Sequence, residues 1–348
     1  MTKIKTALLS YGMSGKVFHA PFLTLHAGFD LMGSWERSKK LIQQDYPDAV
    51  SYRSLEEILD SDVELVVVNT PVATHYEYAK KVLQAGKHAI VEKAFTTTTA
   101  EAEELKAIAK EKGLKLAVFQ NRRWDSDFLT VKAIVDQHLL GEIVEAEFRF
   151  DRYNPNLSPK VHKESSNLGA GILKDLGPHL IDQAVHLFGF PTAVFADIRV
   201  IRENSMVDDG LDILLYYPEM RVRLRSGFFF MEPVPSYAVH GRKGSLVKSR
   251  GDVQEDDLKA GKTPNFENWG VEPEDKMGIL HFEKDGEVVR GLVETIPGNY
   301  YHFFDGMHKT ITEDKQEPVT ADDGIRVMKI IDAAIESSRT KTVIELSE

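Results

Sequence analysis

Cysteine is absent from this chain of 348 residues. Without thiols the protein has no disulfides, no thiolate nucleophile and no zinc or iron–sulfur site with cysteine ligands. A run of about 18 apolar residues is also lacking, so we expect no membrane-spanning helix. The N-terminal residues do not follow the basic and then apolar pattern of a secretory signal, and we therefore expect a cytoplasmic protein.

Basic side chains are outnumbered by acidic ones, and the formal net charge is -11. Because nucleic acids attract basic surfaces, we expect no nucleic-acid partner. The 12 histidines lack the short spacings that are typical of metal ligands, so we expect no metal site. A hydrophobic content of 42% and a charged content of 28% are ordinary for a globular protein, and the length favours two domains.

Short apolar segments alternate with helical patterns in the first third of the chain. Two of the helices begin with capping boxes, Ser54 with Glu57 and Thr98 with Glu101. Short buried strands that alternate with helices are typical of a parallel sheet covered on both faces. The sequence therefore predicts an α/β fold with a doubly wound N-terminal Rossmann domain, whose strands span 4–9, 29–35, 65–68, 89–91 and 114–119.

A glycine turn, Ser10-Tyr11-Gly12-Met13-Ser14-Gly15, follows the first predicted strand. At this place in a nucleotide-binding domain, backbone N–H groups at a helix start bind the pyrophosphate of a dinucleotide. Ser10 stands where the first glycine of the motif G-x-G-x-x-G is expected, so a tight turn without a ligand is the alternative. The candidate cofactor-binding residues are Gly12, Met13, Ser14 and Gly15.

Two adjacent residues after the second predicted strand favour different cofactors. Glu36 lies about twenty residues beyond the glycine turn, where a carboxylate accepts hydrogen bonds from the ribose hydroxyls of NAD. Arg37 follows it immediately and is suited to pair with the 2′-phosphate of NADP. Both cofactors stay open, and Glu36 gives a lean toward NAD.

Polar residues follow two neighbouring strands at the same predicted edge of the sheet, where ligands of open α/β sheets bind. We take Thr70, Pro71, His75, Glu92 and Lys93 as candidate cofactor-binding residues. The ammonium group of Lys93 is also suited to stabilise negative charge on a substrate oxygen. The alternative for Lys93 is a solvated lysine at a strand end.

The stretch from Gly169 to His179 is a glycine-flanked turn that leads into an apolar helix, which is predicted to continue to a stop at position 189. Asp175 and His179 lie four residues apart, and this spacing places them on one helical face. A carboxylate near a helix start stays ionised, and histidine is suited to move a proton near neutral pH. The alternative is that Asp175 is a helix cap and His179 a half-buried structural histidine.

From Trp124 onward the pattern changes to strands that alternate apolar and polar residues, expected at 144–153, 193–202, 211–217, 221–229 and 237–240, with a hairpin turn at 218–220. We expect an α+β domain with an open, mostly antiparallel sheet and helices on one side. Arg221, Arg223 and Arg225 would form its outer face, which is either solvated or covered by a partner subunit. The predicted domains are 1–123 and 124–348.

Further segments of the second domain carry predictions. Helices are expected at 126–140 and 322–339, the latter docking on the body of the protein, and 248–283 is expected to be irregular surface. The loop 154–168, which contains His162 and Lys163, is long enough to be a lid or binding loop. Aromatic walls and fixed donors suit a ring rich in hydroxyl groups, so Arg122, Trp124 and Tyr153 are candidate substrate-binding residues.

Read together, these motifs resemble the Gfo/Idh/MocA oxidoreductases over essentially the whole chain. The resemblance rests on Gly12 with Gly15, Asn69-Thr70-Pro71 with His75, Ala85-Gly86-Lys87-His88, Glu92-Lys93, and Gly169 to His179 followed by Ile181-Asp182. Four other stretches look like the branch of this family that contains NADP-dependent scyllo-inositol 2-dehydrogenases: Phe18-His19-Ala20-Pro21, Asn121-Arg122-Arg123-Trp124-Asp125, Trp269-Gly270 and Pro297-Gly298-Asn299-Tyr300.

The resemblance implies an enzyme that moves hydride between a nicotinamide and a ring carbon of a cyclic polyol or sugar. It implies Lys93, Asp175 and His179 as the catalytic set. In these roles His179 takes the hydroxyl proton, Lys93 steadies charge on that oxygen, and Asp175 orients the substrate and His179. The resemblance also implies a homo-oligomer, a dimer or tetramer, built through the C-terminal sheet.

One departure from the family motif and two other functions stay open. Ala94 replaces a proline whose peptide bond with the preceding lysine is commonly cis in the family, so Lys93 is either aimed differently or followed by a cis bond. One other function is a sugar-modifying enzyme that retains its cofactor through oxidation, elimination and reduction. The other is a nucleotide-sensing protein without catalysis.

Overall fold

The computed structural model describes residues 3–36, 39–159, 164 and 169–348. The chain forms two compact units, and each unit consists of three stretches of sequence. The first unit comprises Met1–Asn121, Gln254–Trp269 and Asn299–Ile325, and the second comprises Arg122–Val253, Gly270–Gly298 and Arg326–Glu348. The functional division into 1–123 and 124–348 stays a prediction.

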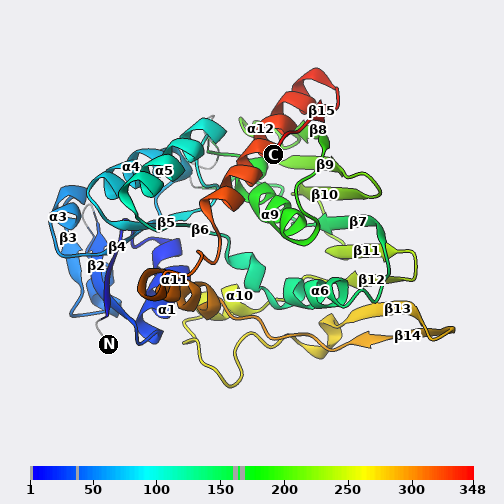
Figure 1. Ribbon diagram of the computed structural model, residues 1–348, viewed down its shortest axis with the longest axis horizontal. Helices are drawn as coiled ribbons and strands as arrows, with labels where there is room; N and C mark the ends of the chain where they lie inside the picture. The colour runs from blue at the N-terminus through cyan, green and yellow to red at the C-terminus, as the bar shows by residue number, and fades with distance from the viewer. Residues whose placement is uncertain (1–2, 37–38, 160–163, 165–168) are drawn as a thin grey trace. The chain divides into compact units, whose positions relative to one another are not determined.

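The first unit is built on a sheet of six parallel strands in the order β3-β2-β1-β4-β5-β6 (Figure 1). The order reverses between β1 and β4, which makes this the topological switch point at which open α/β sheets bind ligands. The prediction of a doubly wound parallel sheet is confirmed. The strands are β1 (Ile4–Leu8), β2 (Phe29–Trp35), β3 (Val50–Tyr52), β4 (Leu65–Val68), β5 (His88–Glu92) and β6 (Leu116–Phe119).

Helices cover both faces of this sheet. The connections through α1 and α4 run in opposite directions along the sheet, so right-handed crossovers place these helices on opposite faces (Figure 1). The capping box at Thr98 is confirmed at the start of α5. At Ser54 only half of the box forms, because the carboxylate of Glu57 accepts from the N–H of Arg53 instead. The helices are η1 (Gly15–His19), α1 (Ala20–Leu25), α2 (Ile42–Asp45), α3 (Leu55–Leu59), η2 (Val72–Thr74), α4 (His75–Gln84), α5 (Thr99–Lys112), α10 (Gln254–Lys259) and α11 (Tyr301–Glu313).

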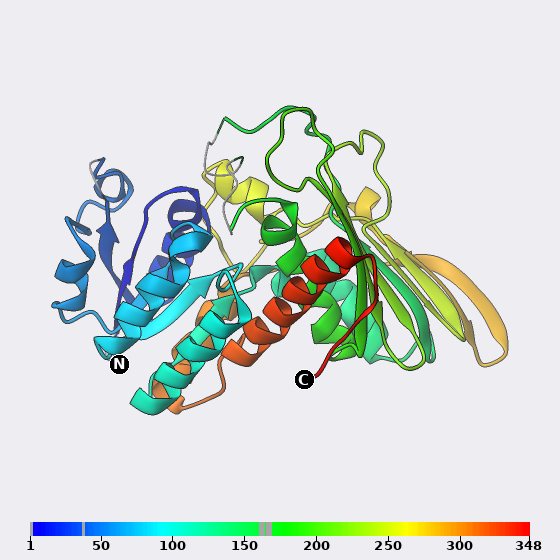
Figure 2. The same ribbon diagram turned by 90° about the horizontal axis from the view of Figure 1, so that it is seen from above.

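The second unit is built on a sheet of nine strands in the order β14-β13-β12-β11-β7-β10-β9-β8-β15 (Figure 1), and Figure 2 shows the same sheet from above. Among the described strands of this sheet only β7 and β10 pair in parallel, so the predicted, mostly antiparallel sheet is confirmed. Val222 and Leu224 of β10 are buried and Arg221 and Arg223 exposed, which is the predicted alternation. The strands are β7 (Ile143–Arg149), β8 (Ala193–Arg199), β9 (Gly210–Tyr216), β10 (Arg221–Gly227), β11 (Tyr237–Gly241), β12 (Gly244–Lys248), β13 (Gly278–Lys284), β14 (Glu287–Val293) and β15 (Ile344–Glu345).

Helices pack on one face of the second sheet, with α9 against β7 and β10 and α6 against β12. The C-terminal helix also contacts this unit, since the hydroxyls of Ser337 and Ser338 accept from the N–H groups of Ala196 and Ile198 in β8 (2.9 Å each). Among the described helices, none joins the length to the apolar composition that a bilayer crossing requires. The helices are η3 (Asn121–Trp124), α6 (Ser126–Asp136), α8 (Ile172–Asp175), α9 (Gly177–Phe188), η4 (Glu274–Lys276) and α12 (Ala321–Thr340), which begins in the first unit.

The prediction that 248–283 is irregular is wrong, because α10 and most of β13 lie within it. Charged residues hide both elements from a hydrophobicity pattern. Three acidic residues fill the first turn of α10, and the second half of β13 is exposed. A solvated strand next to the edge of a sheet lacks the apolar face on which period-two prediction depends.

Candidate active site

The glycine turn of the first unit lies between β1 and η1, as the sequence predicts. Ser10 replaces the first glycine of the motif without disturbing the turn, because its hydroxyl accepts the N–H of Gly12 (3.2 Å). The N–H of Lys16 then donates to the carbonyl of Gly12 (2.9 Å), which starts the helical segment. Met13, at the tip of the turn, is 50% exposed. The backbone of this turn is therefore open to a ligand.

Gly15 packs too closely against β1 for a side chain. A Cβ atom at this position would lie 2.3 Å from the carbonyl oxygen of Ser10 and 3.0 Å from Nδ2 of Asn69. The same amide nitrogen of Asn69 donates to the Ser10 carbonyl (2.7 Å), while its buried Oδ1 has no hydrogen-bond partner among the described residues. A buried amide oxygen without a donor is costly, and it marks a place where a ligand or water would supply one.

Glu92, at the end of β5, joins the glycine turn to the strand that carries Lys93. Its Oε1 accepts from the hydroxyl of Ser14 and lies 2.9 Å from Nε2 of His19, whose ring is fully buried. Burial alone would raise the pKa of Glu92, but the contacts with His19 and Ser14 outweigh it, so the pKa lies below its ordinary value. The structure thus brings together Ser14, Glu92 and Lys93, whose backbone N–H donates to Oε2 of Glu92 (3.3 Å).

The segment after Lys93 is held by His75. The peptide bond between Lys93 and Ala94 is cis, which answers the question left open by the missing proline. The buried ring of His75 places Nδ1 2.8 Å from the carbonyl oxygen of Ala94 and Nε2 2.8 Å from that of Thr70. Burial lowers the pKa of His75 despite these carbonyls. His75 therefore links the two strand ends, while its predicted contact with the cofactor stays a prediction.

The strand ends next to the glycine turn differ in exposure. Thr70 follows β4 and is partly buried, with its hydroxyl accepting from the hydroxyl of Thr74 (2.8 Å). Pro71 is exposed. Both lie at the carboxyl edge of the sheet, beside the switch point, where the sequence places them.

Glu36 contacts the backbone of the following helix. Its Oε1 accepts from the N–H of Leu41 (2.8 Å) and its Oε2 from the N–H of Ile42 (3.1 Å), so the carboxylate caps α2. The lean toward NAD assumed that this carboxylate serves the ribose. The cap gives Glu36 a second reason to be acidic, and the lean stays a prediction. Arg37 lies outside the described residues.

The helix predicted from the glycines near 169 to position 189 is wrong in one respect, because it consists of two helices, α8 and α9. They meet at Leu176, whose backbone dihedrals of -104° and -28° depart from the ideal helix. Pro178 lies in the first turn of α9 and has no N–H to donate to the preceding turn, so the hydrogen-bond ladder is interrupted there.

Asp175 and His179 of the second unit lie on either side of this break. Asp175 is the last residue of α8 and is partly buried, and His179 lies in the first turn of α9 with 5% of its surface exposed. Asp175 therefore precedes the start of α9 rather than beginning one continuous helix. Their roles in catalysis, like that of Lys93 in the first unit, stay predictions.

The candidate substrate residues of the second unit occupy different surroundings. Arg122 donates from Nη1 to Oδ2 of the buried Asp125 (3.1 Å), and its guanidinium lies over the ring of Phe150. Trp124 is partly buried in η3. Tyr153 is 52% exposed. Its backbone forms a β-bridge with Phe229. His162 and Lys163 of the predicted loop lie outside the described residues.

Two of the buried ion pairs lie in stretches that carry the family resemblance, and the sequence predicts neither of them. Arg123 makes two hydrogen bonds to Asp182 of α9, 2.8 and 2.7 Å long, and both side chains are buried. The other pair, His19 with Glu92, lies in the first unit. Both stretches contribute to the family resemblance, but their partners lie 59 and 73 residues away, so no local pattern predicts the pairs.

The residues at the edge of the first sheet fit a dinucleotide. The turn exposes Gly12 and Met13, and the Oδ1 atom of Asn69 is an acceptor without a partner among the described residues. Gly12 to Gly15 would hold the pyrophosphate, and Thr70 and Pro71 would contact the rest of the cofactor. The fold and this edge define the class of the protein, an enzyme with a dinucleotide-binding domain and a separate α+β unit.

Comparisons with known proteins identify the family. A model described as "Oxidoreductase family, NAD-binding Rossmann fold" matches residues 4–120, and one described as "Oxidoreductase family, C-terminal alpha/beta domain" matches residues 132–346. The scyllo-inositol 2-dehydrogenase (NADP(+)) IolW of Bacillus subtilis (strain 168) is 38% identical over 344 residues, which cover 99% of this chain and 96% of that protein.

Solved structures give the same result. The structure of yvaA from Bacillus subtilis has a TM-score of 0.94 at 36% identity and covers 99% of both chains. A structure from Bacteroides fragilis NCTC 9343 has a TM-score of 0.91 at 43% identity and covers 99% of this chain and 100% of that one. The chain belongs to the Gfo/Idh/MocA oxidoreductase family, and it is a dehydrogenase or reductase that binds NAD or NADP.

Proposed function

We propose that the protein transfers hydride between NADP and a ring carbon of a cyclic polyol or sugar, of the inositol type. The observation that carries this proposal is the link at the end of β5, where Glu92 ties the glycine turn to Lys93. It joins the glycine turn to the strand end that carries Lys93, whose ammonium group would act beside the cofactor in this proposal. The similarity to a scyllo-inositol 2-dehydrogenase along nearly the whole chain supports the substrate class.

Three side chains share the chemistry in this proposal. The cofactor supplies the hydride acceptor or donor. His179 takes the proton of the substrate hydroxyl as hydride leaves the ring carbon, and it returns the proton in the reverse direction. Lys93 stabilises the negative charge that grows on the same oxygen. Asp175 holds the substrate and His179 in register. Arg122, Trp124 and Tyr153 would contact the remaining hydroxyl groups, and His75 would position the strand ends.

We infer NADP rather than NAD as the cofactor, which departs from the lean that Glu36 alone gives. Both oxygens of Glu36 already accept backbone N–H groups, so ribose hydroxyls compete with the cap of α2 for this carboxylate. Arg37 provides a guanidinium of the kind that pairs with a phosphate. The relative IolW is named for NADP.

The exposed face of the nine-stranded sheet supports a homo-oligomer. Val288 and Leu292 of β14 are 72% and 70% exposed, and they lie on an outer strand of an open sheet. Apolar side chains on such a strand favour burial against a second copy. Light scattering after size exclusion, on the wild type and on Val288→Asp with Leu292→Asp, tests this assembly. A monomeric wild type contradicts it.

A cytoplasmic location stays a prediction.

Titration with NADPH and NADH, followed by an absorbance screen at the nicotinamide band with inositols, aldoses and their keto forms, tests the proposed function. We expect tighter binding of NADPH and formation of NADPH from NADP with a cyclic polyol. Substrate conversion without stoichiometric release of reduced cofactor would indicate the enzyme that retains its cofactor. Binding without any hydride transfer would indicate the sensing protein, and binding of neither nucleotide would contradict the proposal at its first step.

A further inference from the structure

The short helix α8, which ends at Asp175, has no side-chain cap of its own. The N–H groups of its first two residues donate to Asp208, which precedes β9 and lies 35 residues beyond Leu173. The carbonyl oxygen of Asp208 accepts from the N–H of Ile172 (2.8 Å), and its Oδ2 accepts from the N–H of Leu173 (2.7 Å). A helix start satisfied in this way is fixed in place by a residue outside the helix.

Gly171 lets Asp208 come this close. Its φ angle is +92°, a region that other residues rarely adopt, and a Cβ atom at this position would lie 2.1 Å from Oδ1 of Asp208. The absence of a side chain at position 171 and the carboxylate at position 208 are therefore two parts of one contact. This assigns a physical reason to a glycine of the turn that precedes Asp175.

The residue after Asp208 holds the same segment from the other side. Asp209 is fully buried and accepts from the backbone N–H groups of Ile201 (2.7 Å) and Arg202 (2.9 Å) and from Nε of Arg202 (3.0 Å). The Arg202 guanidinium in turn donates to the carbonyl of Asn156 (3.1 Å) and to both oxygens of Glu164. Asp208 is thus mounted on a buried network and not on a free loop.

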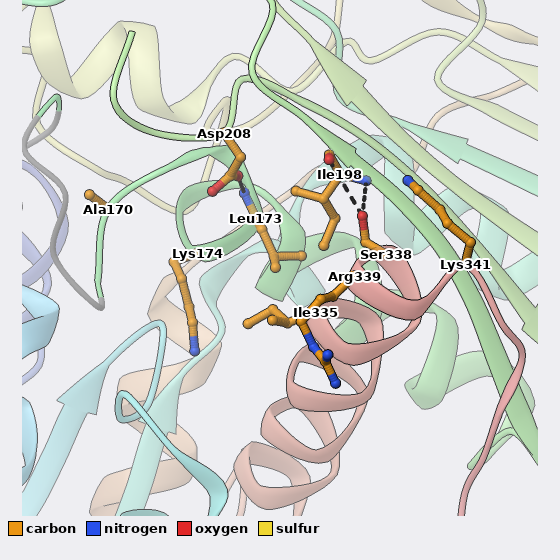
Figure 3. A pocket seen from close by; sticks show the side chains of 9 residues that line it. All are labelled: Ala170, Leu173, Lys174, Ile198, Asp208, Ile335, Ser338, Arg339 and Lys341. Atoms are coloured by element: carbon orange, nitrogen blue, oxygen red, sulfur yellow. Dashed lines mark hydrogen bonds between the residues drawn. The ribbon is translucent and has the colours of Figure 1, made fainter.

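Asp208 also faces a cavity of about 500 Å³ beside α8 (Figure 3). The cavity is lined by Leu173 and Lys174 of α8 and by Ile335 and Arg339 of α12. Figure 3 shows the hydrogen bond from the Leu173 N–H of α8 to the carboxylate of Asp208, which precedes β9.

We propose that Asp208 is a positioning residue for the reaction. It accepts hydrogen bonds from two N–H groups of α8 and so sets the position of Asp175 and, through the α8–α9 turn, of His179. The role rests on the proposed function of Asp175 and His179. Asp208 acts through α8 and does not touch the reacting atoms. A shift of the order of 1 Å in a catalytic group is enough to lower turnover by about 100-fold.

Three variants test the role. Asp208→Ala removes the acceptor for Leu173, and we expect kcat to fall by about 10- to 100-fold while the Kd for NADPH stays within about twofold of the wild type. Asp208→Asn keeps an amide oxygen in the same place, so its kcat should stay within about threefold. Asp197→Asn removes the carboxylate charge from an exposed pair with Lys341 and serves as a matched control that should not change kcat. Normal turnover in Asp208→Ala, or equal losses in the Ala and Asn variants, would overturn the proposal.

The contact with Gly171 provides a second test. Gly171→Ala pushes against Asp208, so it should lower kcat by a similar factor, and the double variant Gly171→Ala with Asp208→Ala should be no slower than the slower single variant. Effects that multiply would contradict a shared contact. Hydrogen exchange of the Leu173 amide gives a readout that needs no substrate. Faster exchange in Asp208→Ala supports the anchor even if the wild type proves inactive, in which case only the proposed function fails.

Discussion

The two units hold their candidate site residues in different ways. In the first unit the glycine turn lies at the sheet edge where β4 and β5 end. The turn is held by the Ser10 hydroxyl at the Gly12 N–H and by side chains at these strand ends, Asn69 and Glu92. In the second unit Asp175 ends a four-residue helix whose start is satisfied by Asp208 from another part of the chain. One region is defined by its fold, and the other depends on a few individual hydrogen bonds.

This difference suggests a division of tasks. A sheet edge tolerates changes in single side chains, because backbone groups and strand ends supply much of the binding surface. A short helix pinned at its start responds to the loss of one acceptor. We therefore expect substitutions in the first unit to act mainly on cofactor affinity and stability, and substitutions around α8 and α9 to act mainly on turnover.

The largest expected effect lies in the second unit. His179→Ala removes the proposed general base, and kcat should fall by about 1,000-fold, within the range usual for such a group. The Kd for NADPH should stay within about twofold. His186→Ala, an exposed position on the same helix, is the matched control and should leave both quantities unchanged. A parallel loss of cofactor affinity in His179→Ala would mean that the residue is structural and that the division of tasks is wrong.

The two glycines of the turn sharpen the comparison from the first unit. Gly15→Ala places a Cβ atom 2.3 Å from the Ser10 carbonyl, so it should lower both stability and NADPH affinity. Gly12→Ala meets only the Ser10 hydroxyl, at an ordinary 3.4 Å, and should leave the Tm unchanged. If a ligand approaches the backbone at Gly12, Gly12→Ala should still lower the affinity for NADPH by about 10-fold or more. Unchanged affinity in Gly12→Ala would contradict a pyrophosphate site in this turn.

The difference between the two units also explains which features could be predicted from the sequence. Both ends of strand β2 agree with the predicted range 29–35, and the capping box at Thr98 is predictable because its two residues are local. Strand β3 has three residues, too few for any periodicity, and it was not predicted. In the first unit the candidate residues needed only the rule that ligands meet the carboxyl edge of a parallel sheet.

The second unit resisted prediction where distant residues decide the structure. Nothing near Asp208 announces that it caps a helix 35 positions earlier, and nothing near Arg123 points to Asp182, 59 positions away. The break at Leu176 was missed because its flanking residues keep helical spacing, while Pro178 removes one backbone donor without changing the apolar pattern. Sequence patterns report periodicity and turn chemistry, and they do not report which acceptor a free N–H finds.

Glu92 allows the link inside the first unit to be tested by pH. Its folded pKa lies below the ordinary 4.5, so its ionisation stabilises the fold above that pH, and this stabilisation is lost as the pH falls through the folded pKa. At pH 7 we expect Glu92→Gln to lower the free energy of unfolding by about 2 kcal/mol. The difference from the wild type should shrink below pH 4.5, as measured by urea denaturation. Glu77→Gln, which changes an exposed pair with Lys81, is the control and should show almost no difference from the wild type in the free energy of unfolding. A difference that is constant with pH would show that the carboxylate charge of Glu92 is not what joins the turn to β5.

The smallest expected effect concerns Glu36, and it separates two interpretations of the same carboxylate. As a cap of α2, Glu36 contributes about 1 kcal/mol to stability, and Glu36→Ala should lose that amount while the ratio of NADPH to NADH affinity changes by less than about threefold. As a ligand of the ribose hydroxyls, it would control cofactor choice, and Glu36→Ala would shift the ratio toward NADPH by more than about 10-fold. Isothermal titration with both nucleotides and thermal unfolding of the same variant measure both quantities. Because both oxygens of Glu36 accept backbone N–H groups, we expect the first outcome. That outcome would mean that single hydrogen bonds also hold the backbone of the first unit, because the Glu36 carboxylate would serve α2 and not the cofactor.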